Sequence, residues 1–161
     1  MMKNKFMQTV VGTFLGLLML VVGTQIFVSG QNNGKQSQSI EGTWRTIVTP
    51  RNCQTGDPVA PAFPGTLSFN KGGTLAGNTT VFSSAYGVWQ REPGFHDYSF
   101  AFTNFRFNTS GVFIGTQTVR QTVALGASNN EFTATGTAEM FDTNGNLIAT
   151  GCSTVTGTRF E

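Results

Sequence analysis

The tripeptides Gly42-Thr43-Trp44 and Gly157-Thr158-Arg159 lie near the two ends of a β-rich segment and decide how it folds. The first tripeptide opens the first predicted strand, and the second lies in the last. Between them, short runs rich in Thr, Val and Phe are separated by Gly, Asn and Pro, and no window shows a convincing helical period. The segment is therefore predicted to be all-β.

Eight strands are expected, and short turns join them. Turn signals such as Asn70-Lys71-Gly72-Gly73 and Asp142-Thr143-Asn144-Gly145 separate the runs at hairpin-like intervals. Short links make consecutive strands antiparallel neighbours, so an up-and-down meander is predicted. The expected strands cover residues 41–49, 64–70, 73–81, 85–92, 96–107, 112–125, 131–141 and 146–160.

Apolar and polar residues alternate most clearly in the second half of the chain. In the strand expected at 131–141, Phe132, Ala134 and Met140 share one face, and Thr and Glu residues share the other. One buried face and one solvated face are typical of an antiparallel sheet. In the strand expected at 96–107, the aromatic residues change phase near Thr103-Asn104. This change predicts a β-bulge at that point.

The first thirty residues are predicted to be a signal peptide. Lys3 and Lys5 precede an apolar stretch from about residue 10 to residue 28, and small residues follow up to Gly30, where cleavage is expected. The alternative is an uncleaved membrane anchor. Residues 31–40 are expected to form a flexible polar stub, and residues 41–161 the barrel domain. The mature protein is therefore expected to be secreted or periplasmic, with no stable membrane span.

Charge and cysteine content restrict the mature chain further. From Gln31 onward, two lysines and six arginines balance eight acidic residues, so 8 − 8 gives a net charge of zero. A neutral domain without a basic cluster has no electrostatic reason to bind nucleic acid. The only cysteines are Cys53 and Cys152. Two cysteines in an exported chain most often form one disulfide.

A tryptophan early in the first strand, covered by an arginine from the last strand, resembles the closing clasp of the calycin superfamily of lipocalins, avidins and fatty-acid-binding proteins. The resemblance implies an eight-stranded antiparallel up-and-down calycin-like β-barrel, with structural roles for Trp44 and Arg159. If Trp44 is opposite Arg159, paired positions sum to 203 and Cys152 faces residue 51, two positions from Cys53. The clasp and the disulfide therefore predict the same closing pair of strands.

Residues with catalytic potential are few. His96 is the only histidine, and there is no His/Cys cluster, so neither a metal site nor a cofactor is expected. Glu92, His96 and Asp97 lie in one predicted turn, where they could supply an acid and a base. The alternative is a Pro-Gly hairpin with solvated charges.

A ligand cavity is the second candidate site. Large aromatic residues face small ones such as Ala138, Gly151 and Ser153 across the expected barrel, which leads either to a filled core or to a cavity. Buried amides could orient a ligand there. The candidate ligand-binding residues are Phe100, Phe102, Phe113, Gln117, Gln121 and Phe132.

Three functions follow from these features. The first is a non-catalytic lipocalin-like barrel that binds a small hydrophobic or aromatic molecule. The second is a barrel isomerase or cyclase that resembles allene oxide cyclase. The third is a protein-binding or protease-inhibitor module that acts through its loops. The oligomeric state is left open.

Overall fold

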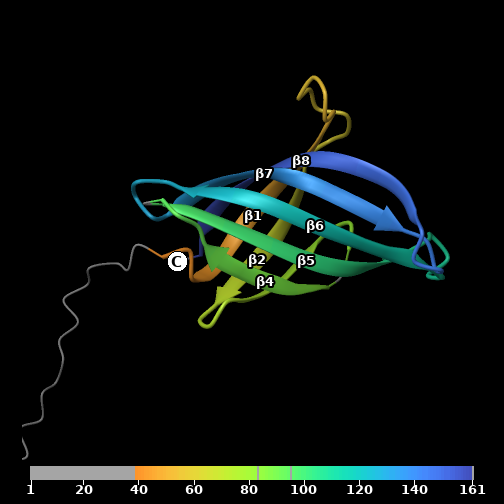
Figure 1. Cartoon of the computed structure of the whole chain (residues 1–161), viewed down its shortest axis with the longest axis horizontal. Helices are drawn as coiled ribbons and strands as arrows, with labels where there is room; N and C mark the ends of the chain where they lie inside the picture. The colour runs from red at the N-terminus through yellow and green to blue at the C-terminus, as the bar shows by residue number, and fades with distance from the viewer. Residues whose placement is uncertain (1–38, 83, 95, 161) are drawn as a thin grey trace, which may run out of the picture. The chain divides into compact units, whose positions relative to one another are not determined.

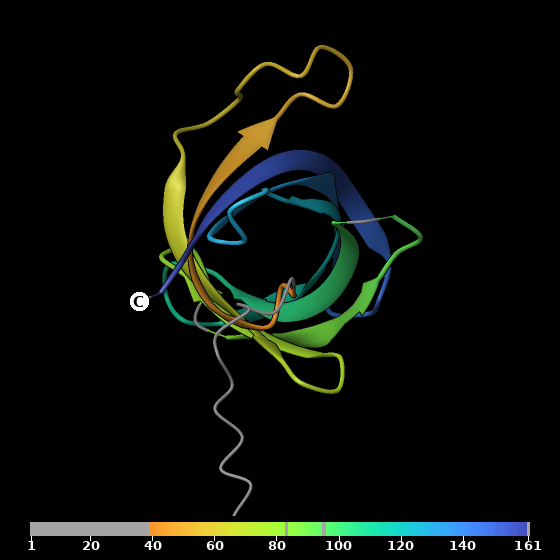
Figure 2. The ribbon, with the colours of Figure 1, turned by 90° about the vertical axis from the view of Figure 1, so that its left-hand side faces the viewer.

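The computed structural model describes residues 39–82, 84–94 and 96–160, and in this part the eight strands form one closed antiparallel barrel (Figures 1 and 2). The all-β prediction is confirmed. The predicted signal segment and most of the stub lie outside the described residues. The strands are β1 Gly42–Arg51, β2 Phe63–Asn70, β3 Thr74–Thr79, β4 Ala85–Arg91, β5 Asp97–Phe107, β6 Phe113–Leu125, β7 Glu131–Phe141 and β8 Leu147–Arg159.

Pairing of β1 with β8 closes the barrel in the predicted register. Trp44 is opposite Arg159, and Arg51 is opposite Cys152. The predicted disulfide joins Cys53, just beyond β1, to Cys152, and the two Cα atoms are 5.2 Å apart. Because both outer strands of the meander are paired, no strand edge in the described barrel is left open for another chain.

Trp44 fills one end of the barrel, which we call the closed end. Its side chain is fully buried, and the indole Nε1 donates a hydrogen bond of 2.8 Å to the carbonyl of Ile40. The indole meets the ring of Phe132 edge to face, with the centroids 5.0 Å apart. Ile40, which sequence analysis placed at the end of the polar stub, is itself fully buried. The core therefore begins before the first strand.

Arg159 covers Trp44 from the last strand. The guanidinium carbon lies 4.3 Å from the centroid of the indole, which is the geometry of a cation–π contact. Partial burial lowers the pKa of Arg159, but an arginine stays charged throughout the physiological range. The guanidinium donates hydrogen bonds to the carbonyls of Ser39, Glu41 and Asn129.

The glycines of the two tripeptides are required by this packing. Gly42 has φ of +125°, and a Cβ there would lie 2.7 Å from the Nη1 atom of Arg159. A Cβ at Gly157 would overlap the ring of Phe132. Only glycine therefore fits both positions without displacing a neighbour.

The β-bulge predicted at Thr103-Asn104 is wrong. Strand β5 keeps its alternation through Asn104, which is buried, and the register shifts only between Arg106 and Phe107. Phe105 and Phe107 are exposed and pack against Phe113, with centroid distances of 5.9 and 6.0 Å. The change of phase at Thr103-Asn104 comes from aromatic side chains that move to the outer face, while the pairing with β6 stays in register through Arg106.

Replacing Arg159 by lysine tests the clasp. Arg159→Lys keeps the positive charge but loses the planar fork that reaches three carbonyls, so we expect a loss of about 1–3 kcal/mol in the free energy of unfolding. Denaturant titration measures it. The control is Arg120→Lys, at an exposed ion pair with Glu139, where a change below about 1 kcal/mol is expected. Equal effects of the two variants would contradict the structural role of the clasp.

Two glycines of β8 give a matched test of packing. Gly157→Ala introduces a methyl group into the Phe132 ring, so destabilisation by about 1–3 kcal/mol is expected. A Cβ at Gly151 has no heavy atom within 4 Å, and Gly151→Ala is expected to leave stability nearly unchanged. Thermal unfolding of the two variants compares them directly. A Gly157→Ala variant as stable as Gly151→Ala would show that this end of the barrel is loosely packed.

Candidate functional site

The interior is hollow toward the end opposite Trp44, which we call the open end. A cavity of about 340 Å³ lies there, bounded by inward-facing residues of β1, β2, β3, β5, β6, β7 and β8 and by the segments around Val59 and Phe82. Pockets that bind small molecules usually measure about 300–1,000 Å³. The cavity is therefore large enough for one small ligand.

This space exists because large aromatic side chains on one side of the barrel face small residues on the other. Phe100 and Phe102 on β5 are buried, and their rings are stacked with an interplanar angle of 9° and centroids 6.0 Å apart. Across the lumen, β7 contributes Ala138 and β8 contributes Gly151. A Cβ atom at Gly151 would have no heavy atom within 4 Å, so the space beside this glycine is empty of protein atoms. The pattern predicted from sequence thus leads to a cavity and not to a filled core.

Phe82 completes the aromatic wall, and sequence analysis missed it. Its ring centroid lies 5.8 Å from that of Phe102, and it lines the cavity from the segment between β3 and β4. Because Phe82 lies outside every strand, no alternation pattern indicates which way it points. Only the path of the chain around the open end brings it to the site.

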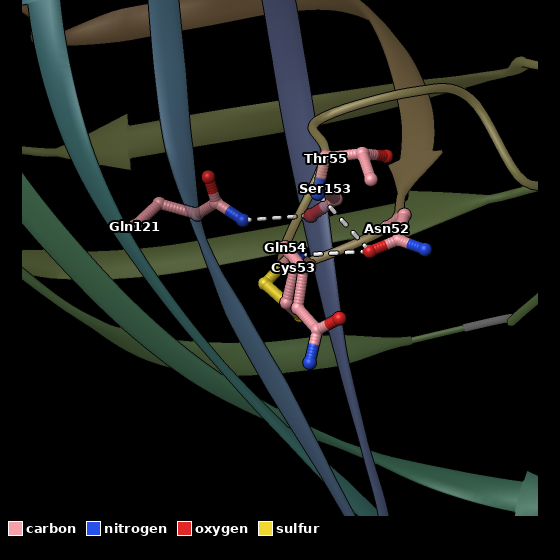
Figure 3. Close-up of a disulfide and its surroundings, with 7 residues drawn as sticks. Asn52, Cys53, Gln54, Thr55, Gln121 and Ser153 are labelled. Atoms are coloured by element: carbon pink, nitrogen blue, oxygen red, sulfur yellow. Dashed lines mark hydrogen bonds between the residues drawn. A yellow bond between two sulfur atoms is a disulfide. The ribbon is translucent and has the colours of Figure 1, made fainter.

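One buried amide provides the main polar group of the cavity. The side chain of Gln121 on β6 is 2% exposed, and its Nε2 donates a hydrogen bond of 2.9 Å to the Oγ atom of Ser153 on β8 (Figure 3). The Gln121 Oε1 atom has no hydrogen-bond partner among the described residues. Gln117 and the buried Thr46 also line the cavity. A buried amide oxygen without a partner suits a ligand that donates a hydrogen bond.

The disulfide lies at the mouth of the cavity. Cys152 lines the cavity, and its partner Cys53 belongs to the segment between β1 and β2, which projects from the barrel wall (Figures 1 and 3). In this segment, the Asn52 side chain accepts hydrogen bonds from the backbone N–H groups of residues 54 and 55. Arg51 donates hydrogen bonds to Thr154 and to the carbonyl of Gly56. The Cys53–Cys152 disulfide and the hydrogen bonds of this turn together hold the segment at the mouth of the cavity.

The predicted acid–base turn is not part of this cavity. None of Glu92, His96 and Asp97 lines it. The carbonyl of His96 accepts a hydrogen bond from the backbone of Leu125, which places the turn at the closed end. Hydrogen bonds from Ser99 and then Gln90 lower the pKa of Glu92, so its carboxylate stays ionised at neutral pH.

The six predicted ligand-binding residues divide into two groups. Phe100, Phe102, Gln117 and Gln121 come together around the cavity. The prediction that Phe113 points inward is wrong, because it is 41% exposed and packs with the outer aromatic residues of β5. Phe132 does point inward, but it packs against Trp44 at the closed end and does not line the cavity.

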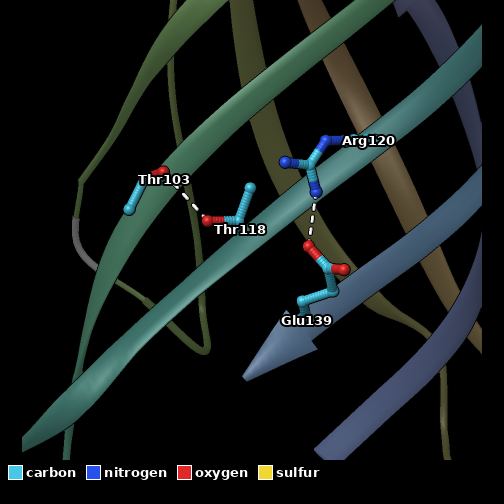
Figure 4. A network of polar contacts seen from close by, with 4 residues as sticks. All are labelled: Thr103, Thr118, Arg120 and Glu139. Atoms are coloured by element: carbon cyan, nitrogen blue, oxygen red, sulfur yellow. Dashed lines mark hydrogen bonds and ion pairs between the residues drawn. The ribbon is translucent and has the colours of Figure 1, made fainter. Parts of the chain in front are cut away.

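A second, shallower depression of about 530 Å³ lies on the outer face of β4 to β7. Its floor includes Arg120, which forms an ion pair with Glu139, and a Thr103–Thr118 hydroxyl pair lies nearby on β5 and β6 (Figure 4). The Arg120 side chain is 59% exposed and is already paired with Glu139, so the depression is open to solvent. We therefore place the candidate site inside the barrel.

Comparison with known proteins adds no functional assignment. No protein-family model matches the chain, and no curated protein is similar to it. The closed eight-stranded barrel is consistent with the calycin-like fold.

None of the described residues forms a helix with the length and apolar character that a membrane crossing needs. Within the same residues, no three His, Cys, Asp or Glu side chains gather as a metal site would require.

Removing the disulfide tests its role at the mouth. The crosslinked residues are 99 apart in sequence, so the double variant Cys53→Ser, Cys152→Ser is expected to lose up to about 4.7 kcal/mol of folding free energy. Denaturant titration of the oxidised protein and the double variant measures the difference. A loss below about 1 kcal/mol would mean that the open end holds together without the crosslink.

Proposed function

We propose that this protein binds one small, mainly apolar molecule inside its barrel and does not transform it. The observation that carries the proposal is the cavity of about 340 Å³ with an aromatic wall and one hydrogen-bonded pair of the buried Gln121 amide and the Ser153 hydroxyl. Apolar walls with a few fixed polar groups are typical of small-molecule sites. Burial of an apolar ligand there would release water from both surfaces and so drive binding.

The cyclase alternative has less support. Of the described residues that line the cavity, Arg51 alone carries a titratable side chain, and its guanidinium is engaged at the rim. Gln117 and Gln121 can orient a substrate, but a neutral amide is no general acid or base at neutral pH. The groups at hand therefore favour binding over proton transfer.

A protein-binding module is the second candidate function, and one observation favours it. Phe105, Phe107 and Phe113 form an exposed aromatic cluster on the outer face at the open end. Exposed apolar clusters often mark contact surfaces. The hollow interior argues against it, because a barrel that acted only through its loops would gain stability from a filled core.

We also infer that the protein acts outside the cytoplasm, in the periplasm or beyond the cell. The Cys53–Cys152 disulfide supports this, because such bonds persist in oxidising compartments. The predicted signal segment agrees with it.

Titration with the neutral fluorophore N-phenyl-1-naphthylamine tests the proposed function. Saturable one-to-one binding with increased emission is expected for the disulfide-bonded protein. Gly151→Leu places a side chain in the open space beside β8, so the affinity is expected to fall at least about tenfold.

The matched control is Thr150→Leu, which adds the same side chain to the neighbouring exposed position on the same strand. This variant is expected to bind the fluorophore as the unmodified protein does. No saturable binding by the unmodified protein would overturn the proposal. An equal loss in both variants would place the fluorophore somewhere other than the cavity.

A further inference from the structure

The polar group of the cavity is built across three strands. In the sheet register, Gln121 on β6 is opposite Gly136 on β7, and Gly136 is opposite Ser153 on β8. Because Gly136 carries no side chain, the Gln121 amide can pass over β7 and reach the Ser153 hydroxyl, 2.9 Å away (Figure 3). Both side chains line the same cavity. The hydrogen bond between Gln121 and Ser153 therefore holds two polar groups at one position of a mainly apolar cavity wall.

The donors and acceptors of Gln121 and Ser153 that have no partner in the protein determine which polar group of a ligand they can bind. The Oε1 atom of Gln121 is buried and accepts no hydrogen bond from a described residue. The Ser153 oxygen accepts the amide proton, so its own O–H remains a donor. The pair therefore places an acceptor, Gln121 Oε1, beside a donor, the Ser153 O–H, and the second N–H of the Gln121 amide is a further donor.

We propose that the ligand carries an uncharged hydroxyl group on the end that enters the barrel, and that Gln121 and Ser153 bind it. This inference rests on the proposed function. A hydroxyl donates to Gln121 Oε1 and accepts from Ser153 with the same oxygen atom. The rest of the ligand is apolar, because Phe100, Phe102 and Val119 line the same cavity as the pair. The chemical class is a neutral alcohol with an aliphatic or aromatic body.

Other polar ends fit this pair less well. A carboxylate would bring a full charge into an apolar wall and would set its oxygens against the Gln121 oxygen. Arg51, the only charged residue among the described lining residues, is engaged with Thr154 and Gly56. An ether or a hydrocarbon donates no proton, so Gln121 Oε1 would stay unpaired after water is expelled.

Competition with a bound fluorophore tests the inference with probes of one size. The probes are 1-decanol, its isomer methyl nonyl ether, and decanoate at pH 8, each displacing N-phenyl-1-naphthylamine. We expect 1-decanol to bind about tenfold more tightly than the ether and more tightly than decanoate.

Substitution of the amide locates this preference. Gln121→Met has a similar volume but lacks the amide donor and the strong carbonyl acceptor, so the affinity for 1-decanol is expected to fall about tenfold, while the ether binds as before. The control is Gln90→Met, on the exposed outer face, which should keep the full preference. Circular dichroism and thermal unfolding check the fold of each variant. If Gln121→Met does not fold, Ser153→Ala takes its place and is expected to reduce the same preference.

The outcomes separate the two proposals. If the unmodified protein binds neither the fluorophore nor any probe, the proposed function itself fails. If the fluorophore binds but the ether competes as well as 1-decanol, the cavity binds ligands and the hydroxyl assignment is overturned. A preference that survives in Gln121→Met, or in Ser153→Ala where that variant replaces it, would also overturn the assignment.

Discussion

The pairing of β1 with β8 is the constraint on which the rest of this structure depends. It fixes Trp44 opposite Arg159 and so sets which residues of both strands face the lumen. A slip of one residue would reverse every side chain of a strand, because side chains alternate with a period of two. The same register brings Cys152 beside the chain that follows β1, where the disulfide forms. Closure, core and crosslink therefore have one cause.

The two ends of the barrel are stabilised in different ways. At the closed end, the indole of Trp44, the ring of Phe132 and the guanidinium of Arg159 fill the space between the strands. At the open end, a covalent crosslink holds the rim and the interior stays hollow. A cavity lowers stability in proportion to its volume, so the packed end and the disulfide together offset the space that is left for a ligand.

The electrostatic character of the interior restricts the chemistry. The charged groups of the predicted turn at residues 91–97 lie at the closed end. The cavity wall is apolar except for a few uncharged polar side chains and Arg51 at its rim. In such surroundings, one hydrogen bond with fixed geometry discriminates strongly, because a bound apolar ligand displaces the water that could replace it. The Gln121–Ser153 pair has this position, and its remaining donor and acceptor describe the ligand more closely than the apolar wall does.

The sequence by itself determined the strands and their order, because alternation and turn residues are local signals with fixed periods. The closing register was an expectation from the resemblance of the two tripeptides to the calycin clasp. It also indicated that Phe100, Phe102, Gln117 and Gln121 face the interior. It did not reveal that Phe105, Phe107 and Phe113 form an outer cluster, since a change of phase along one strand has the same pattern whether the backbone bulges or the apolar face changes sides. Nor did it reveal the inward position of Phe82, or the Gln121–Ser153 pair. These contacts join strands that are distant in sequence, so only the closed barrel decides which side chains meet and how much space remains between them.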